Sequence, residues 1–454
     1  MGPKSQSAQS KDLFRQELDE LIDQQHPLVK LAGLIDWRVF EREWAGYFPA
    51  TVGRPALPPR LIAGLLYLQH TFACSDEMLL DRWVENPYWQ YFCGEIYFQH
   101  ALPCDPSSLT RWRQRIGEEG VEWLLTQTIV AAQVSKAVQP SSFDKVIVDT
   151  TVQEKAIAHP TDSRLLEGIR SKLIGLAKAA GLRLRQNYNR EAPRLACQIG
   201  RYAHAKQFKR MRAALRHQKT LVGRVVRDIE RQMQQLPAAW HEEMAHRLAQ
   251  ARRLLAQQQN DKHKLYSLHA PEVECINKGK SRRPHEFGVK VTVAVTHQEG
   301  LVVGMRSLPG NPYDGHSLDE ALEQVQILTD RRPKEVYVDL GYRGHTVPED
   351  IKVYHPRLKR GMTRRLRQAI RRRSAIEPII GHMKNDGLLR RNWLKGELGD
   401  YLHAVLCGCG QNLRLILKKL RLLCALIGLT WQQDRPYQRC LSRWSGQSGL
   451  ALPV

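Results

Sequence analysis

The sequence predicts an α/β fold with large helical parts, on three observations. Apolar residues recur at helical spacing within residues 21–135, as in LVKLAGLIDWRVFEREW and PPRLIAGLLYLQH. Short β-branched runs, among them KVIVDTTVQ, HEFGVKVTVAVT and KEVYVDL, are typical of strands. Residues 164–264 are rich in Gln, Ala and Arg and poor in Pro and Gly, which predicts an antiparallel pair of helices. A chain of 454 residues is long enough for two or three domains.

The charge balance points to a polyanionic partner. The formal net charge is +23, and residues 164–264 alone hold 23 Lys or Arg against 7 Asp or Glu. Nucleic acid is the leading partner for such an excess, and the basic helices could track a phosphate backbone or simply present a solvated face. No window offers 18 uncharged apolar residues, so we expect no membrane span.

The start of the chain and its cysteines favour a cytoplasmic protein. MGPKSQSAQSKDLFRQ has no apolar stretch typical of a secretion signal. The nine cysteines show no C-x-x-C spacing, which favours reduced thiols. His403 and Cys407 lie one helical turn apart in HAVLCGCG. A zinc site would need further ligands, and with no second pair nearby, packing of small residues in a helix is the favoured interpretation.

The N-terminal helices resemble a helix-turn-helix module. The spacing of apolar residues predicts two short helices around a polar turn in GRPALPPRLIAGLLYLQHTFACSDEMLLDRW. Ser75 could start the second helix. In CDPSSLTRWRQRIG, Asp105 or Ser107 can cap a helix that could enter a major groove. The alternative is a plain helical bundle with a solvated basic face. The arginines expected to contact DNA in this region are Arg54, Arg60, Arg111, Arg113 and Arg115.

Two strands carry an acid among apolar neighbours: Asp149 in VIVDTT and Asp339 in VYVDLGY. An aspartate buried in a strand without a partner is costly, so each acid needs a reason to be there. One reason is that each lies at a strand end and caps the next element. The other is that both bind a cation.

Glu377 follows a run from Arg357 to Arg373 that holds nine Lys or Arg and no acid. Ser374-x-x-Glu377 fits a capping box, but Pro378 suits a kinked helix running through this point equally well. On such a helix Arg373 and Lys384 share a face with Glu377, which could also be a surface salt-bridge set.

Together, two strand carboxylates and one helix carboxylate in a basic protein can hold two divalent cations. Mg²⁺ prefers a few carboxylate oxygens and leaves positions for phosphate, and Mn²⁺ could replace it. Two such ions about 4 Å apart stabilise the attacking and the leaving oxygen of a phosphoryl displacement. The neighbouring cations would then hold the DNA backbone.

These motifs resemble the DDE transposases of bacterial insertion sequences, most closely the group named after insertion sequence five. The matching stretches are VDTTVQEKAIAHPTDSRL, KLYSLHAPEVECINKGKSRRPHEFGVKV, GNPYDGHSL, VDLGYRG and GRPALPPRLIAGLLYLQH, and they span residues 30–420. The third family motif is Tyr, two residues, Arg, three residues, Glu, six residues, Lys. Arg373, Glu377 and Lys384 fit it, whereas Ile370 replaces the tyrosine.

The resemblance implies an RNase H-like mixed sheet flanked by helices, with Asp149 on its first strand and Asp339 on a later, adjacent one. It implies Asp149, Asp339 and Glu377 as catalytic ligands of two Mg²⁺ ions, and Arg373 and Lys384 as phosphate-binding groups. Asp314 and His316 would contact the metal ligands rather than the metal itself. Alternatively, Asp314 only forms a turn. It implies cleavage at terminal inverted repeats, joining of the 3′-hydroxyls to target DNA, and a dimer or larger assembly on double-stranded DNA.

Two other functions share these residues. A metal-dependent nuclease on the same core would need the same three acids. A DNA-binding relic without catalysis would favour Ala, Asn or Ser at these positions, and none is present.

The expected regions are a polar tail (1–20), a helix-turn-helix-like domain (21–135), an RNase H-like core (140–163 and 275–425), a basic helical insertion (164–274) and a C-terminal tail (426–454).

Overall fold

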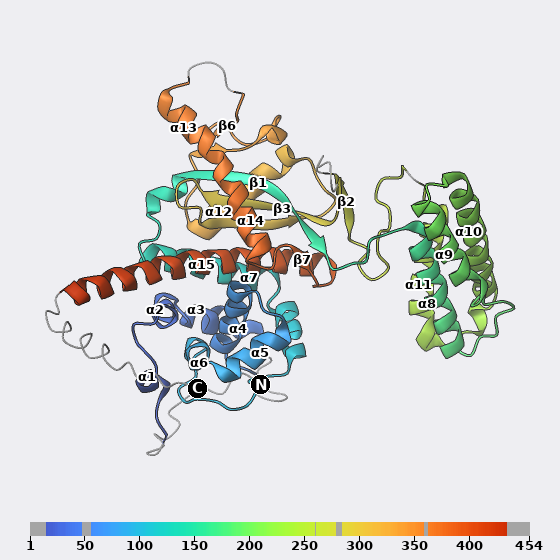
Figure 1. Cartoon of the computed structure of the whole chain (residues 1–454), viewed down its shortest axis with the longest axis horizontal. Helices are drawn as coiled ribbons and strands as arrows, with labels where there is room; N and C mark the ends of the chain where they lie inside the picture. Colours follow the sequence, from blue (N-terminus) through green and yellow to red (C-terminus); the bar gives the residue numbers. More distant parts are fainter. Residues whose placement is uncertain (1–14, 48–55, 259, 278–283, 358–361, 434–454) are drawn as a thin grey trace, which may run out of the picture.

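A mixed sheet forms the centre of the molecule (Figure 1). The structure, a computed structural model, describes residues 15–47, 56–258, 260–277, 284–357 and 362–433. The strand order is β2-β3-β1-β5-β6, with β4 paired to β3 and β7 to β1. β1 runs antiparallel to β3 and parallel to β5. The strands are β1 (Lys145–Lys155), β2 (Glu274–Asn277), β3 (His285–Thr296), β4 (Val302–Leu308), β5 (Glu335–Tyr337), β6 (Lys352–Tyr354) and β7 (Arg391–Asn392).

The predicted strands are confirmed, with one shift. β3 and β4 form the expected hairpin around residues 297–300, and Asp149 lies inside β1. The strand expected to contain Asp339 ends earlier, at Tyr337. Asp339 instead starts a short 3₁₀ helix, Leu340–Tyr342, and its carboxylate accepts a hydrogen bond from the Gly341 amide at 2.8 Å. A short polar side chain that accepts from the backbone is a usual way to end a strand and begin a turn.

The N-terminal helices pack beneath the sheet, and the long helix α15 (Gly396–Gln433) runs between the two (Figure 1). α4 is almost wholly buried, which explains its apolar sequence. Ser75 caps α5 and Asp105 caps α7, as predicted. The helices are α1 (Leu18–Leu21), α2 (Pro27–Leu34), α3 (Arg38–Glu43), α4 (Pro59–Phe72), α5 (Asp76–Glu85), α6 (Pro87–Phe92) and α7 (Pro106–Val134).

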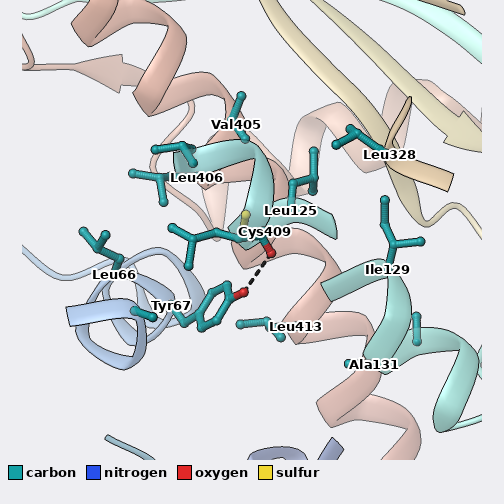
Figure 2. Close-up of a cluster of buried hydrophobic side chains, with 14 of the residues drawn as sticks. Leu66, Tyr67, Leu125, Ile129, Ala131, Leu328, Val405, Leu406, Cys409 and Leu413 are labelled. Atoms are coloured by element: carbon teal, nitrogen blue, oxygen red, sulfur yellow. Dashed lines mark hydrogen bonds between the residues drawn. The ribbon is translucent and has the colours of Figure 1, made fainter. Parts of the chain in front are cut away.

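Figure 2 shows how α4, α7 and α15 meet. Tyr67 of α4 is fully buried, and its hydroxyl donates to the Leu124 carbonyl of α7 at 2.7 Å. Leu406 and Cys409 of α15 complete this cluster. The N-terminal helices and the sheet therefore share one continuous core.

The basic segment forms a bundle that stands apart from the sheet and is joined to it by two chain connections (Figure 1). It has its own core, which includes Leu173, Val226 and Leu248. The predicted pair of helices is wrong: the segment breaks at residues 180–190, 205–207 and 232–237 into four shorter helices. The first, third and fourth share this core, whereas the second packs on the third in a small cluster of its own. The four helices are α8 (Asp162–Ala179), α9 (Glu191–His204), α10 (Phe208–Arg231) and α11 (Ala238–Ala256).

The C-terminal part is mostly helical, with a break between two helices. α14 ends at Asn385, the chain adds β7 beside β1, and α15 begins at Gly396. The buried Asn392 side chain holds the break, since its Nδ2 donates to Asp400 at 2.6 Å. The remaining helices are α12 (Leu318–Thr329), α13 (Arg364–Arg372), a 3₁₀ turn (Arg373–Ala375) and α14 (Ile376–Asn385).

The two faces of the sheet enter different cores because side chains alternate along a strand. Val146 and Val148 of β1 pack in the core that also contains residues of α7, α12 and α15. Ile147 of β1 and Tyr337 of β5 pack in the other, with Ile376 of α14. A mixed sheet with helices on both faces is the RNase H-like arrangement that the resemblance implied. In the described part of the chain, no helix combines the length and apolarity needed to cross a bilayer.

Candidate active site

Strand register brings Asp149 and Asp339 together. Ile147 of β1 pairs with Tyr337 of the parallel neighbour β5. Two residues further along each chain, Asp149 lies inside β1 and Asp339 lies just beyond the end of β5. By alternation Asp149 belongs to the face of Ile147, which is the face that Ile376 of α14 covers. Both acids, with 189 residues between them in sequence, lie near enough to Tyr342 for their charges to raise its pKa.

Glu377 lies in the first turn of α14, on the helix that covers these acids. The capping-box alternative is wrong: Ser374 Oγ donates to the Arg371 carbonyl at 3.0 Å, and no side chain caps α14. The kinked-helix alternative is confirmed, because α13, the 3₁₀ turn and α14 follow one another without a gap. The Glu377 side chain is 66% exposed, so its carboxylate is not used in packing.

Arg373 links the sheet acid to the helix acid. Its guanidinium lies 3.9 Å from an Asp149 oxygen and 3.7 Å from a Glu377 oxygen, and its side chain is 17% exposed. One cation therefore serves a carboxylate from β1 and a carboxylate from α14. The structure thus places Asp149, Arg373 and Glu377 next to one another.

The donor set fits a hard divalent cation. Asp149, Asp339 and Glu377 offer carboxylate oxygens only, which is the chemistry that Mg²⁺ prefers. In the described structure their oxygens do not all lie within 4.8 Å of one another. The positive charge that lies near both Asp149 and Glu377 is the guanidinium of Arg373. An ion held by all three acids would therefore require Arg373 to turn away, leaving its guanidinium free for a phosphate.

A third aspartate, Asp314, lies beside Asp339. A β-carbon added to Gly341 would stand 3.0 Å from an Asp339 oxygen and 3.2 Å from an Asp314 oxygen, so a larger residue here would press on both acids. Next to it, Tyr342 is almost fully buried. The pKa of Tyr342 is raised well above its ordinary value, first by burial and then by the charges of Asp149, Asp314 and Asp339. The charges of three aspartates thus act on one phenol, which stays neutral.

Lys290 of β3 balances part of this charge. Its Nζ lies 3.1 Å from an Asp314 oxygen and donates to the Pro312 carbonyl at 2.7 Å. This contact holds the loop that carries Asp314 against the sheet. His316, predicted to act with Asp314, is exposed and stands edge-on to the Tyr313 ring. The structure thus places Asp314, but not His316, next to the acids.

A basic groove of about 390 Å³ adjoins Arg373. The exposed side chains of Arg367 and Arg371 line it together with Arg373, and Ile370 forms part of its wall. Ile370, which replaces the family tyrosine, is buried in the core beneath the sheet acids. Lys384, seven residues after Glu377, is half-buried in the last turn of α14.

The arginines predicted to contact DNA in the N-terminal region differ in their exposure, and the prediction for Arg113 is wrong. Its side chain is 2% exposed, donates to Asp76 at 3.0 Å and to Gln69 at 2.6 Å, and so holds α7 to α4 and α5. A guanidinium buried in this way cannot reach a phosphate. Arg111, on the same helix, is exposed.

The other arginines of this region are partly committed to contacts within the protein. Arg115 is exposed and lies over the Trp112 ring at 5.4 Å. Arg60 is half-buried, lies over the Trp37 ring at 5.0 Å and donates to the Tyr91 carbonyl at 3.2 Å, which argues for a structural role. Arg54 lies outside the described residues.

Three residues that contact the acids or anchor the helix before Glu377 had been missed. Tyr342 belongs to the VDLGY motif, where only the acid had been singled out. Lys290 is a charged residue within a buried β-branched run, and the cost of burying it signals a partner. Arg372 donates to the His297 carbonyl at 2.8 Å and anchors the end of α13 to the β3–β4 turn. Nothing in the basic run distinguishes it from Arg371 or Arg373.

Comparisons with known proteins agree with the geometry. Residues 16–115 match the family described as "Transposase domain (DUF772)", and residues 253–398 match the family described as "Transposase DDE domain". The second match contains Asp339 and Glu377, while Asp149 lies between the two matches. A Rhizobium meliloti protein, "Uncharacterized protein ORF8 in nfe locus", is 50% identical over 208 residues, which is 46% of this chain and 100% of that protein. No solved structure matches the chain.

Proposed function

The chain belongs to the DDE transposases of insertion sequences, and from that premise we propose that it acts on the ends of its own element. It binds the terminal inverted repeats, cleaves the DNA at their tips and joins the freed 3′-hydroxyls to target DNA. Both steps are phosphoryl transfers, which need positioned reactants and stabilised charge but no covalent enzyme intermediate.

The observation that carries this proposal is the convergence of the acids. Asp149 and Asp339 follow paired positions of β1 and β5 and both act on Tyr342, and α14 carries Glu377, linked to Asp149 through Arg373. These three carboxylates would hold two Mg²⁺ ions, with Mn²⁺ able to replace them. When bound, the ions would activate the attacking oxygen and stabilise the leaving oxygen.

The other residues of the site position the acids and the DNA. Lys290 holds the Asp314 loop against the sheet, and the Asp339 carboxylate is oriented by the Gly341 amide. Arg373 keeps Asp149 and Glu377 paired until DNA arrives, and then turns to a phosphate. The groove lined by Arg367, Arg371 and Arg373 accepts the strand beside the cleaved bond.

We expect Lys384→Ala to weaken binding of the terminal repeats and to flatten its salt dependence. One lost phosphate contact reduces the slope of log K against log salt by about 0.9. The slope is obtained from binding titrations at several salt concentrations. Lys334→Ala is the matched control: this exposed lysine precedes β5, at the opposite end from Asp339. An unchanged slope for Lys384→Ala would remove Lys384 from the DNA interface.

The proposal is tested with DNA that carries the inverted repeats. The genomic DNA on either side of the gene is expected to contain short inverted repeats bounded by a small duplication. Incubation of a fragment ending in those repeats with the protein, Mg²⁺ and a target plasmid should give joined products. Cleaved ends without joined products would instead establish the metal-dependent nuclease. Two ends joined to one target would further require a dimer or larger assembly.

A further inference from the structure

A second group of donor atoms lies far from the acids, where α15 crosses α4. The two helices approach so closely that a β-carbon at Gly410 would stand 2.2 Å from the His70 carbonyl oxygen. At this crossing one nitrogen of His70, one nitrogen of His403 and the Cys407 sulfur lie within 4.8 Å of one another. All three side chains are at most 2% exposed. In the described part of the chain, this is the one such group of three or more His, Cys, Asp or Glu.

Both imidazoles are oriented with one nitrogen free. His70 Nδ1 lies 3.1 Å from the Leu66 carbonyl, and His403 Nδ1 lies 2.9 Å from the Gln153 side-chain oxygen. An oxygen acceptor at Nδ1 fixes the proton there and leaves the lone pair on Nε2. The Nε2 atoms of both residues are buried without a hydrogen-bond partner among the described residues. Histidines that bind metals are oriented in the same way, by a hydrogen bond from the ring nitrogen that does not bind the metal.

Burial keeps both imidazoles neutral, as a metal ligand must be. It lowers the pKa of His70 to about 3 and lowers the pKa of His403 well below its ordinary value. Cys407 Sγ lies 3.7 Å from His403 Nδ1, and burial raises the pKa of its thiol to about 12. Arg414 and the Leu388 backbone act in the opposite direction. The thiol is therefore protonated unless a cation takes the place of its proton.

We propose that His70, His403 and Cys407 bind one Zn²⁺ ion, which fastens the N-terminal helices to the catalytic core. Two imidazole nitrogens and a thiolate are ligands that Zn²⁺ favours, and a water would fill the fourth position. Binding exchanges the thiol proton, which leaves to solvent, for a zinc–sulfur bond. In a tetrahedral site with metal–ligand distances of about 2.0–2.3 Å, the ligands lie roughly 3.3–3.6 Å apart. The three atoms, which lie within 4.8 Å of one another, would therefore approach by at most about 1.5 Å.

This proposal goes beyond the transposase chemistry and is an alternative to the interpretation of HAVLCGCG as packing. His403 and Cys407 had seemed to lack further ligands because His70 is 333 residues away from His403 in sequence. The ion would join α4 directly to α15, and through Gln153 it would reach β1, the strand that carries Asp149. Its role is to hold these elements together, at a place separate from the three acids.

The test measures metal in the full-length protein. Protein incubated with Zn²⁺ and then passed into metal-free buffer should retain one zinc per chain by elemental mass spectrometry. Replacement of zinc by Co²⁺ should give a thiolate-to-cobalt charge-transfer band in the near ultraviolet. Wild-type protein that retains no stoichiometric zinc and shows no such band would overturn the proposal.

Variants assign the ligands. Cys407→Ser and His403→Gln should lose the retained zinc, and Cys407→Ser should lose the cobalt band. Cys409→Ser is the matched control, because Cys409 is equally buried on the same helix but outside the group. Asp339→Asn should keep both signals, which separates this site from the acids. Zinc retained by both Cys407→Ser and His403→Gln would place the ion elsewhere and contradict the proposal.

Discussion

Replacement of Asp339 by Asn is expected to reduce DNA cleavage by on the order of 10³-fold while leaving binding of the terminal repeats nearly unchanged. The amide keeps the oxygen that accepts from the Gly341 backbone at 2.8 Å, so the turn after β5 is preserved. What is lost is one negative charge opposite Asp149, and with it the affinity for the divalent cations.

The measurement compares cleavage rates and binding constants of the wild-type and variant proteins on the same labelled repeat DNA. Asp350→Asn is a suitable control, because Asp350 pairs with Arg332 on the surface and its side chain is 55% exposed. A parallel loss of binding and cleavage in Asp339→Asn would show that the acid serves the fold rather than the chemistry.

Lys155→Met is expected to cause the largest loss of stability, about 3–5 kcal/mol. Lys155 lies at the end of β1 with its side chain 4% exposed, 2.6 Å from Asp400 and 2.9 Å from Glu272. Its removal leaves two carboxylates without a buried cation, whereas methionine preserves the packing volume. The drop is read from denaturant unfolding followed by circular dichroism.

Lys145→Met tests the same exchange at the other end of β1. Lys145 is half-exposed and pairs with Glu335 at 2.9 Å, so its loss should cost no more than about 1 kcal/mol. Similar losses in the two variants would contradict the importance that we assign to the buried ion pairs.

The Lys155→Met defect should depend on pH. Burial raises the pKa of Asp400 to about 6, against the lowering effect of Lys155, and the variant loses that lowering effect. In the folded variant Asp400 therefore binds a proton at a pH at which it is ionised in the unfolded chain. Protonation of Asp400 thus stabilises the folded variant as the pH falls. The defect should be full well above pH 6 and smaller near about pH 5. A defect that grows toward acid pH would reverse this assignment.

Much of the candidate site could be predicted from local sequence. The β-branched runs around Asp149 and Asp339 predict strands, and alternation then places each acid on one face. Glu377 and Arg373 could be paired by helical spacing alone. The pairing of β1 with β5 could not be predicted, because it depends on hydrogen bonds between strands that are distant in sequence.

The failures have the same origin. Arg113 looked like its exposed neighbour Arg111, and only its contact with Asp76, 37 residues away, shows that it is buried. The basic segment was taken as two helices because its breaks hold few Gly or Pro. His70, which lies next to His403 and Cys407, belongs to another helix altogether. Partners that only tertiary packing supplies leave no local pattern.

The most direct test of the catalytic site is a comparison of single and double variants of its acids. Cleavage of labelled repeat DNA in Mg²⁺ would be measured for Asp149→Asn, for Glu377→Gln and for the two combined. If both acids hold the same ions, each single variant should lose nearly all activity and the double variant should be no slower than the slower single variant. Glu377→Gln with near wild-type cleavage would contradict the site and return Glu377 to a surface salt bridge with Arg373.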